Sequence, residues 1–129
     1  MPKIWRIFLV LLLLTPVMLE GSRVNANAQP PIIAADQIVE IDFPMTATFK
    51  LSGTTPAPVD RAELRYSTSG HEYSNAATVE FEETTSIEVA YTVDAQIDYI
   101  EPGVEITYFW ILSNTDGPVA QTEESTLTW

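Results

Sequence analysis

Few residues of this 129-residue chain could carry out acid–base or nucleophilic chemistry. His71 is the only histidine, and it lies between Gly70 and Glu72, two residues after Ser69. A histidine base needs a third group that orients it against a nucleophile, and adjacent loop residues rarely provide that geometry. We therefore expect His71 to be an exposed loop residue, and we assign no catalytic residue.

Paired carboxylates are the next candidates for chemistry. Glu82-Glu83 and Glu123-Glu124 could suggest glycoside hydrolysis, which needs two carboxyl groups that face each other across a cleft. Neighbouring residues of one strand instead point to opposite faces of a sheet. We expect these pairs to be solvated charges that discourage aggregation between sheet edges.

Metal ligands are equally sparse. Asp94, Asp98 and Glu101 could form a calcium site, but the Asp-x-Asp-x-Asp-Gly loop typical of calcium binding is absent. The chain has no cysteine, which excludes disulfides, thiolate metal sites and a catalytic thiol. We predict no metal, no cofactor and no enzyme activity, and a stand-alone enzyme is the least favoured alternative.

Residues 1–28 have the pattern of a secretory signal peptide. Lys3 and Arg6 form a basic head, residues 7–19 are mostly apolar, and an Ala-x-Ala cleavage site ends at Ala28. The alternative is an uncleaved signal that anchors the protein in a membrane. The apolar run is short for a span of about 20 residues, and Pro16 interrupts it. We therefore predict cleavage after Ala28.

The remaining chain is strongly acidic. Residues 29–129 keep three Lys or Arg and 17 Asp or Glu, which gives a net charge of −14. Such a surface repels nucleic acid and anionic lipid. Because the acidic residues are dispersed along the chain, we interpret them as a surface that keeps the protein soluble outside the cell, in preference to an acidic binding site. We expect a protein that is secreted, extracellular or held at the cell surface, with no nucleic-acid partner and no stable membrane span after cleavage.

Apolar and polar residues alternate in short runs from residue 37 to residue 129, after an expected linker at residues 29–36 and with an expected loop at residues 54–58. This alternation indicates half-buried strands. Seven strands in about 100 residues predict an all-β domain, a seven-stranded antiparallel β-sandwich, with a small closed barrel as the alternative. The predicted strands are residues 39–43, 45–51, 61–66, 77–82, 87–93, 104–113 and 119–128.

The C-terminal half resembles the late strands of fibronectin type III and related immunoglobulin-like domains. Residues 99–110 read YIEPGVEITYFW and are followed by NTDG at 114–117. The family has an apolar residue before a Pro-Gly turn, then an alternating strand rich in aromatic residues. The place of the family's tyrosine-corner residue is taken by Ile106, and Tyr108 lies two residues further on.

A narrower resemblance concerns the whole of residues 38–129. The signal peptide, Phe43-Pro44, the strand at 61–66 and the Pro-Gly-to-Trp110 segment are similar to the sandwich domain that precedes a peptidase-MA-like, zincin-type module in some exported bacterial proteins. That zinc site needs a His-Glu-x-x-His helix, and this chain has one histidine. The resemblance implies a non-catalytic interaction module, accessory to a larger protein such as a metallopeptidase, with the protease module absent.

The strand at 104–113 suggests where such a module would bind. One face carries residues that we expect in the core: Val104, Ile106, Tyr108, Trp110 and Leu112. The other face carries Phe109 and Ile111, where a solvated sheet would have polar residues. Either neighbouring strands cover this pair, or it forms a docking surface for another protein domain or chain, to which Trp129 could also belong.

The alternative function is a carbohydrate-binding β-sandwich module of the cell surface. Sugar binding would use aromatic rings on one sheet face. The candidates are Tyr66, Tyr73, Tyr91, Tyr99 and Trp129, although most of them fall on the predicted inner face.

Overall fold

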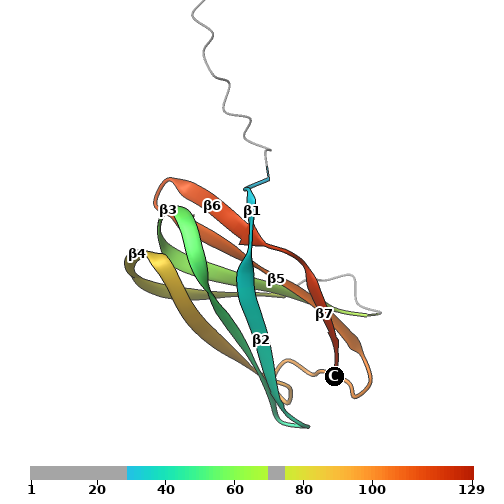
Figure 1. Ribbon diagram of the computed structural model, residues 1–129. Coiled ribbons are helices and arrows are strands. Elements are labelled where there is room, and N and C mark those ends of the chain that lie inside the picture. The colour runs from blue at the N-terminus through green and yellow to red at the C-terminus, as the bar shows by residue number, and fades with distance from the viewer. Residues whose placement is uncertain (1–28, 70–74) are drawn as a thin grey trace, which may run out of the picture.

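The computed structural model describes residues 29–69 and 75–129, which form strands joined by turns (Figure 1). Within these ranges there is no helix, and hence none with the length and apolarity needed to cross a membrane. The all-β prediction is confirmed. The strands are β1 Ile32–Ile33, β2 Ala35–Asp42, β3 Thr46–Thr68, β4 Asn75–Asp94, β5 Glu105–Asn114, β6 Gly117–Thr122 and β7 Ser125–Thr128.

The predicted strands are divided differently in the structure. The two predicted on either side of residues 54–58 form the continuous strand β3, so the loop expected there is part of a strand. Those predicted at 77–82 and 87–93 likewise form β4, and the one at 119–128 is divided between β6 and β7. β1 and the start of β2 lie within residues 29–36, the expected linker, because this segment already pairs with the sheet.

β3 lies at the centre of the hydrogen-bonded sheet. It pairs antiparallel with β2, β4 and β5, and β5 also pairs antiparallel with β6 and β7. The expectation of a purely antiparallel sheet is wrong, because β1 runs parallel to β6, with Ile32 opposite Gln121. Although β1 and β2 follow each other in the chain, they pair with different strands: β1 pairs with β6, and β2 pairs with β3.

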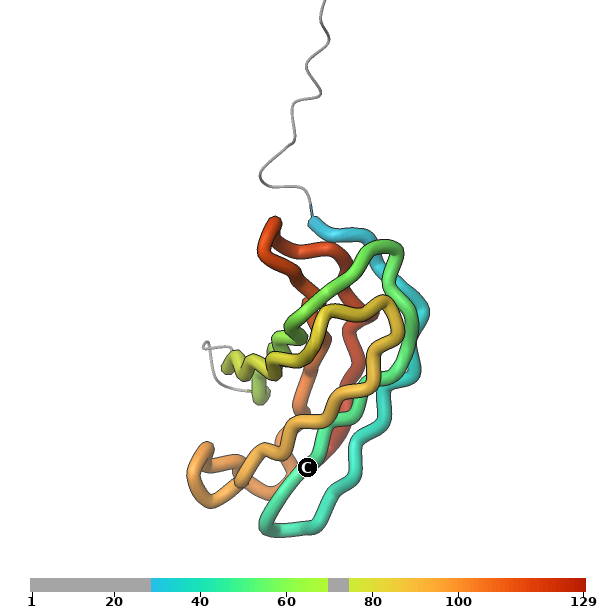
Figure 2. Tube along the Cα trace, turned by 90° about the vertical axis from the view of Figure 1, so that its left-hand side faces the viewer, coloured from blue at the N-terminus to red at the C-terminus, as the bar shows by residue number. Residues whose placement is uncertain are grey.

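Strands β3 and β4 are long enough to contribute to two layers. The first half of β3 pairs with β2 and with the second half of β4, whereas its second half pairs with the first half of β4 and with β5. The register shifts between Thr54 and Arg61, where Pro56 and Pro58 have no N–H to donate. β3 turns back at this point and the sheet folds over itself (Figure 2). The arrangement is compatible with a β-sandwich.

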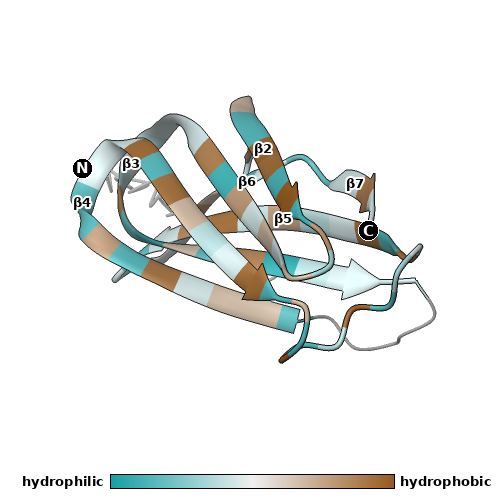
Figure 3. Ribbon diagram, turned by 90° about the horizontal axis from the view of Figure 1, so that it is seen from below, coloured by the Kyte–Doolittle hydropathy of each residue, from teal (hydrophilic) through white to brown (hydrophobic). Residues whose placement is uncertain are grey.

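The core consists of the inward-facing side chains of these layers. Ile106, Tyr108, Trp110 and Leu112 are buried, as the alternation of β5 predicts, and Val104 is half-buried. Apolar and polar residues alternate along the strands (Figure 3). The largest fully buried side chains are Trp110, Phe49, Leu51, Leu64, Ile106, Leu112, Val59, Val93 and Thr122.

Candidate functional site

Phe109 and Ile111 lie on the outer face of β5, as predicted, but they are half-buried. Opposite them on β3 stand Arg65 and Glu63, whose side chains form an ion pair. Phe109 also lines a small depression of about 120 Å³ together with Arg65 and Glu124. Neighbouring strands therefore cover part of this pair.

Trp129 is placed elsewhere. Its side chain is only 7% exposed and belongs to the core, where its ring lies 5.9 Å from that of Phe43. Its backbone N–H donates to the carbonyl oxygen of Val104 at 2.8 Å, and its own carbonyl accepts from the N–H of Gly103 at 2.7 Å. The structure does not bring Trp129 together with Phe109 and Ile111.

The structure describes only some of the residues that could act in catalysis or metal binding. His71 and Glu72 lie outside the described residues. Over residues 29–69 and 75–129, no group of three or more His, Cys, Asp or Glu side chains converges as a metal site would require, so Asp94, Asp98 and Glu101 do not form one.

The aromatic candidates for sugar binding are mostly turned inward. Tyr66 and Trp129 are buried, Tyr91 is half-buried, and Tyr73 lies outside the described residues. In the described part of the chain, the large aromatic side chains that are exposed are Phe43 and Tyr99. The broad outer groove of about 480 Å³ over β2, β3 and β4 is lined by aliphatic, polar and charged side chains without an aromatic ring.

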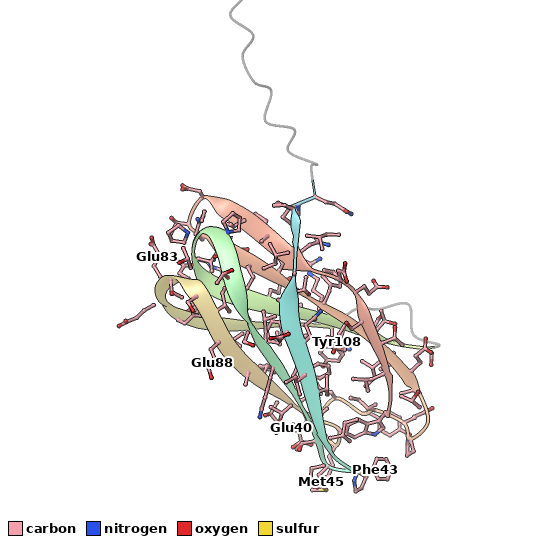
Figure 4. All side chains as sticks on the ribbon, in the orientation of Figure 1. Glu40, Phe43, Met45, Glu83, Glu88 and Tyr108 are labelled. Carbon is pink, nitrogen blue, oxygen red and sulfur yellow. The ribbon has the colours of Figure 1, made fainter. Side chains whose placement is uncertain are left out.

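A cluster of exposed apolar side chains lies at one end of the molecule, and we call it the apolar end. It consists of Phe43 (56% exposed), Met45 (44%), Ile97 (81%) and Tyr99 (72%). Phe43 and Met45 lie at the turn between β2 and β3, at the lower tip in Figure 4. Ile97 and Tyr99 lie in the connection between β4 and β5, which reaches the same end beside the C-terminus (Figure 1).

Hydrogen bonds join the two segments of the apolar end. The N–H of Ala95 donates to the carbonyl oxygen of Met45 at 2.9 Å, and the amide of Gln96 lies 3.4 Å from the sulfur of Met45. The N–H of Met45 donates to the carbonyl oxygen of Asp42 at 2.8 Å and closes the β2–β3 turn. These contacts hold the turn and the connection as one surface.

The first half of the β4–β5 connection is a turn capped by Asp94. Asp94 accepts hydrogen bonds through its carbonyl oxygen from the N–H groups of Ile97 and Asp98, and through its side chain from the N–H of Gln96. The N–H of Ile100 reaches back to the carbonyl of Ala95 at 3.2 Å. This last bond is the closure of a Schellman motif, whose left-handed position usually holds glycine.

Tyr99 occupies that left-handed position, with φ at 46°. A bulky residue in this region is uncommon, and its backbone is strained. The geometry points the Tyr99 ring into solvent while Ile100, the next residue, is buried at 7% exposure. Strain of this kind tends to be retained where function needs it.

Asp98 connects the apolar end to the core. The pKa of Tyr66 is raised to about 12, chiefly by burial of the phenol and further by the negative charge of Asp98, which also accepts its hydrogen bond. The phenol of Tyr66 therefore keeps its proton to a higher pH than an ordinary tyrosine does.

The alternation that identified the core did not single out these residues. Phe43 and Met45 fit the period-2 pattern of the predicted strands at 39–43 and 45–51, but both lie at the turn between β2 and β3. The available signal was their position beside Pro44, together with two large apolar residues, Ile97 and Tyr99, in a segment without strand periodicity.

Comparison of the chain with protein-family models and with curated proteins finds no match.

Proposed function

We propose that this protein is a non-catalytic, exported interaction module with a fibronectin type III-like or immunoglobulin-like sandwich, which docks to another protein domain or chain. The sandwich is supported by the way β3 and β4 each contribute to two layers. A place beside a larger protein, such as a metallopeptidase, is supported by the sequence resemblance of residues 38–129 alone.

The observation that carries the docking role is the apolar end. Soluble monomers rarely leave several large apolar side chains together in water, and such clusters mark contact sites. Phe43, Met45, Ile97 and Tyr99 all exceed 40% exposure, whereas Phe109 and Ile111 on the outer face of β5 are half-buried. We therefore assign the docking surface to the apolar end in preference to the outer face of β5.

Site-specific photo-crosslinking tests the docking role. A benzoylphenylalanine at position 43 of the full chain, produced in its native cell, should give discrete protein adducts on irradiation. The matched control places the same group at Ile38, which is 57% exposed but lies on the outer face of β2. Adducts that form equally at both positions, or at neither, would contradict the proposal.

Export is supported by the basic head and apolar run of residues 1–28. Intact-mass measurement of the exported protein should find Gln29 as its first residue. A mature species that keeps residues 9–14 would show that the segment remains as an anchor.

A further inference from the structure

The charges around the apolar end are all of one sign in the described part of the chain. Four carboxylates belong to its two segments: Asp42, Asp94, Asp98 and Glu101. Asp42, Asp98 and Glu101 are exposed, and none of the four takes part in an ion pair among residues 29–69 and 75–129. The centre of this surface is therefore apolar and its rim is negative.

The Lys and Arg side chains of residues 29–69 and 75–129 are engaged elsewhere. Lys50 pairs with Glu40 at 2.5 Å on the outer face of β2 and β3, and Arg61 pairs with Asp60 at 3.1 Å. Arg65 pairs with Glu63, opposite β5. Among the described residues, no Lys or Arg side chain therefore pairs with the rim carboxylates.

We propose that the apolar end binds a protein surface that presents large apolar side chains surrounded by Lys or Arg. This inference rests on the proposed docking function and adds the chemistry of the partner. An apolar centre excludes water and supplies affinity, while complementary charges at the rim select the partner and speed encounter.

The same charges disfavour the other occupants. A second copy of this chain would bring two negative rims together, and the protein as a whole carries a net charge of −12. Anionic lipid is repelled for the same reason. The hydrogen bonds between Met45, Ala95 and Gln96 hold the surface before binding, which lowers the entropic cost of association.

Three synthetic peptides of equal length separate these contributions: alternating leucine and lysine, leucine and glutamate, and serine and lysine. Each is titrated into the ¹⁵N-labelled full chain. The leucine–lysine peptide should shift the amide signals of residues 42–45 and 95–101. It should bind at least about tenfold more tightly than either other peptide, because the leucine–glutamate peptide lacks the complementary charge and the serine–lysine peptide lacks the apolar side chains.

Matched variants then test each part of the surface. Ile97→Ser should weaken binding of the leucine–lysine peptide by about tenfold, because a buried isoleucine is lost from the contact. Glu101→Gln should weaken it by about two- to fivefold, the range of an exposed ion pair. The controls are Ile38→Ser and Glu88→Gln, both exposed on the sheet that forms the outer groove, and both should bind as the parent protein does.

The outcomes separate this inference from the docking function. Shifts that spread over all acidic residues, or equal binding of the serine–lysine peptide, would show unspecific charge attraction and overturn the inference. Dimers in sedimentation that Ile97→Ser abolishes would make a second copy the occupant. If adducts still form at position 43 while the leucine–lysine peptide does not bind, the docking function stands and only the partner chemistry is wrong.

Discussion

The outer face of β5 and the apolar end both carry large apolar side chains outside the core, but their surroundings differ. Phe109 and Ile111 stand within a sheet, with charged residues of β3 beside them, and are half-buried. The side chains of the apolar end lie in a turn and a connection without a flanking strand, and they are 44% to 81% exposed. The neighbouring strands cover part of Phe109 and Ile111, whereas the turn and the connection leave the side chains of the apolar end mostly exposed.

The inner face of β5 shows how much stability a fully buried side chain contributes, against which both outer regions can be compared. Trp110 is 0% exposed, so Trp110→Ala removes a large buried aromatic ring and should reduce the free energy of unfolding by about 3–5 kcal/mol. Urea denaturation measures this loss. A reduction below about 1 kcal/mol would mean that the ring does not pack as the structure shows.

Two matched double variants compare the regions directly. Phe109→Lys with Ile111→Thr should lower the free energy of unfolding by about 2 kcal/mol, because half-buried side chains lose part of a core contribution. Phe43→Lys with Ile97→Thr should lower it by less than about 1 kcal/mol, since both side chains are mostly exposed.

Urea denaturation of the two double variants side by side is the measurement. Equal losses would remove the distinction between the regions. A loss above about 3 kcal/mol for the first variant would place Phe109 and Ile111 in the core.

The link between the apolar end and the core should respond to high pH. The pKa of Tyr66 is about 12 in the folded protein against 10.0 for an ordinary tyrosine, so the folded state holds its proton more tightly. Stability from this group is complete below pH 10 and is lost as the pH rises from 10 through 12. We expect a loss of roughly 1–2 kcal/mol, reduced by solvent screening of the exposed Asp98 carboxylate.

Urea denaturation at pH 9 to 12 and constant ionic strength, compared between the parent protein and Tyr66→Phe, measures this effect. Burial also raises the pKa of Tyr108, although a hydrogen bond with Ser125 lowers it, so Tyr108 contributes to both proteins alike. An identical pH profile in the variant would show that Tyr66 does not hold the connection.

The smallest expected effect has the opposite sign. Tyr99→Gly should raise the free energy of unfolding by about 0.5–1 kcal/mol, because glycine adopts a positive φ without the strain that Tyr99 carries. Thermal melting of the two proteins measures the change. A decrease in stability would show that the exposed ring makes contacts that outweigh the strain.

Sequence periodicity predicted the all-β class of fold and the buried face of β5. Ile106, Tyr108, Trp110 and Leu112 alternate with polar or half-covered residues, and burial of one face follows directly from strand geometry. Periodicity could not reveal that the segment with Pro56 and Pro58 continues a strand, because this depends on pairing with distant residues. The same dependence explains the unexpected parallel pair of β1 with β6.

The candidate site was harder to predict than the core. Exposure of Phe43 and Met45 depends on where a strand ends in space, and Trp129 is buried because its backbone pairs with Gly103 and Val104. Neither fact is encoded in the alternation of nearby residues. An apolar residue in a turn could be noticed from the sequence. Only the folded chain shows that the β2–β3 turn and the β4–β5 connection come together.

The two long strands also shape how quickly the fold can form. Tyr66 and Asn75 are paired only nine positions apart, whereas Thr46 and Asp94, at the other end of the same ladder, are 48 positions apart. Each pair that closes shortens the loop that the next pair must close, so the entropic cost of the distant contacts is spread over many small steps. Because β3 and β4 run through both layers, we expect this stepwise closure to start in one layer and to continue into the other, which would shorten the search that non-local β-sheets otherwise require.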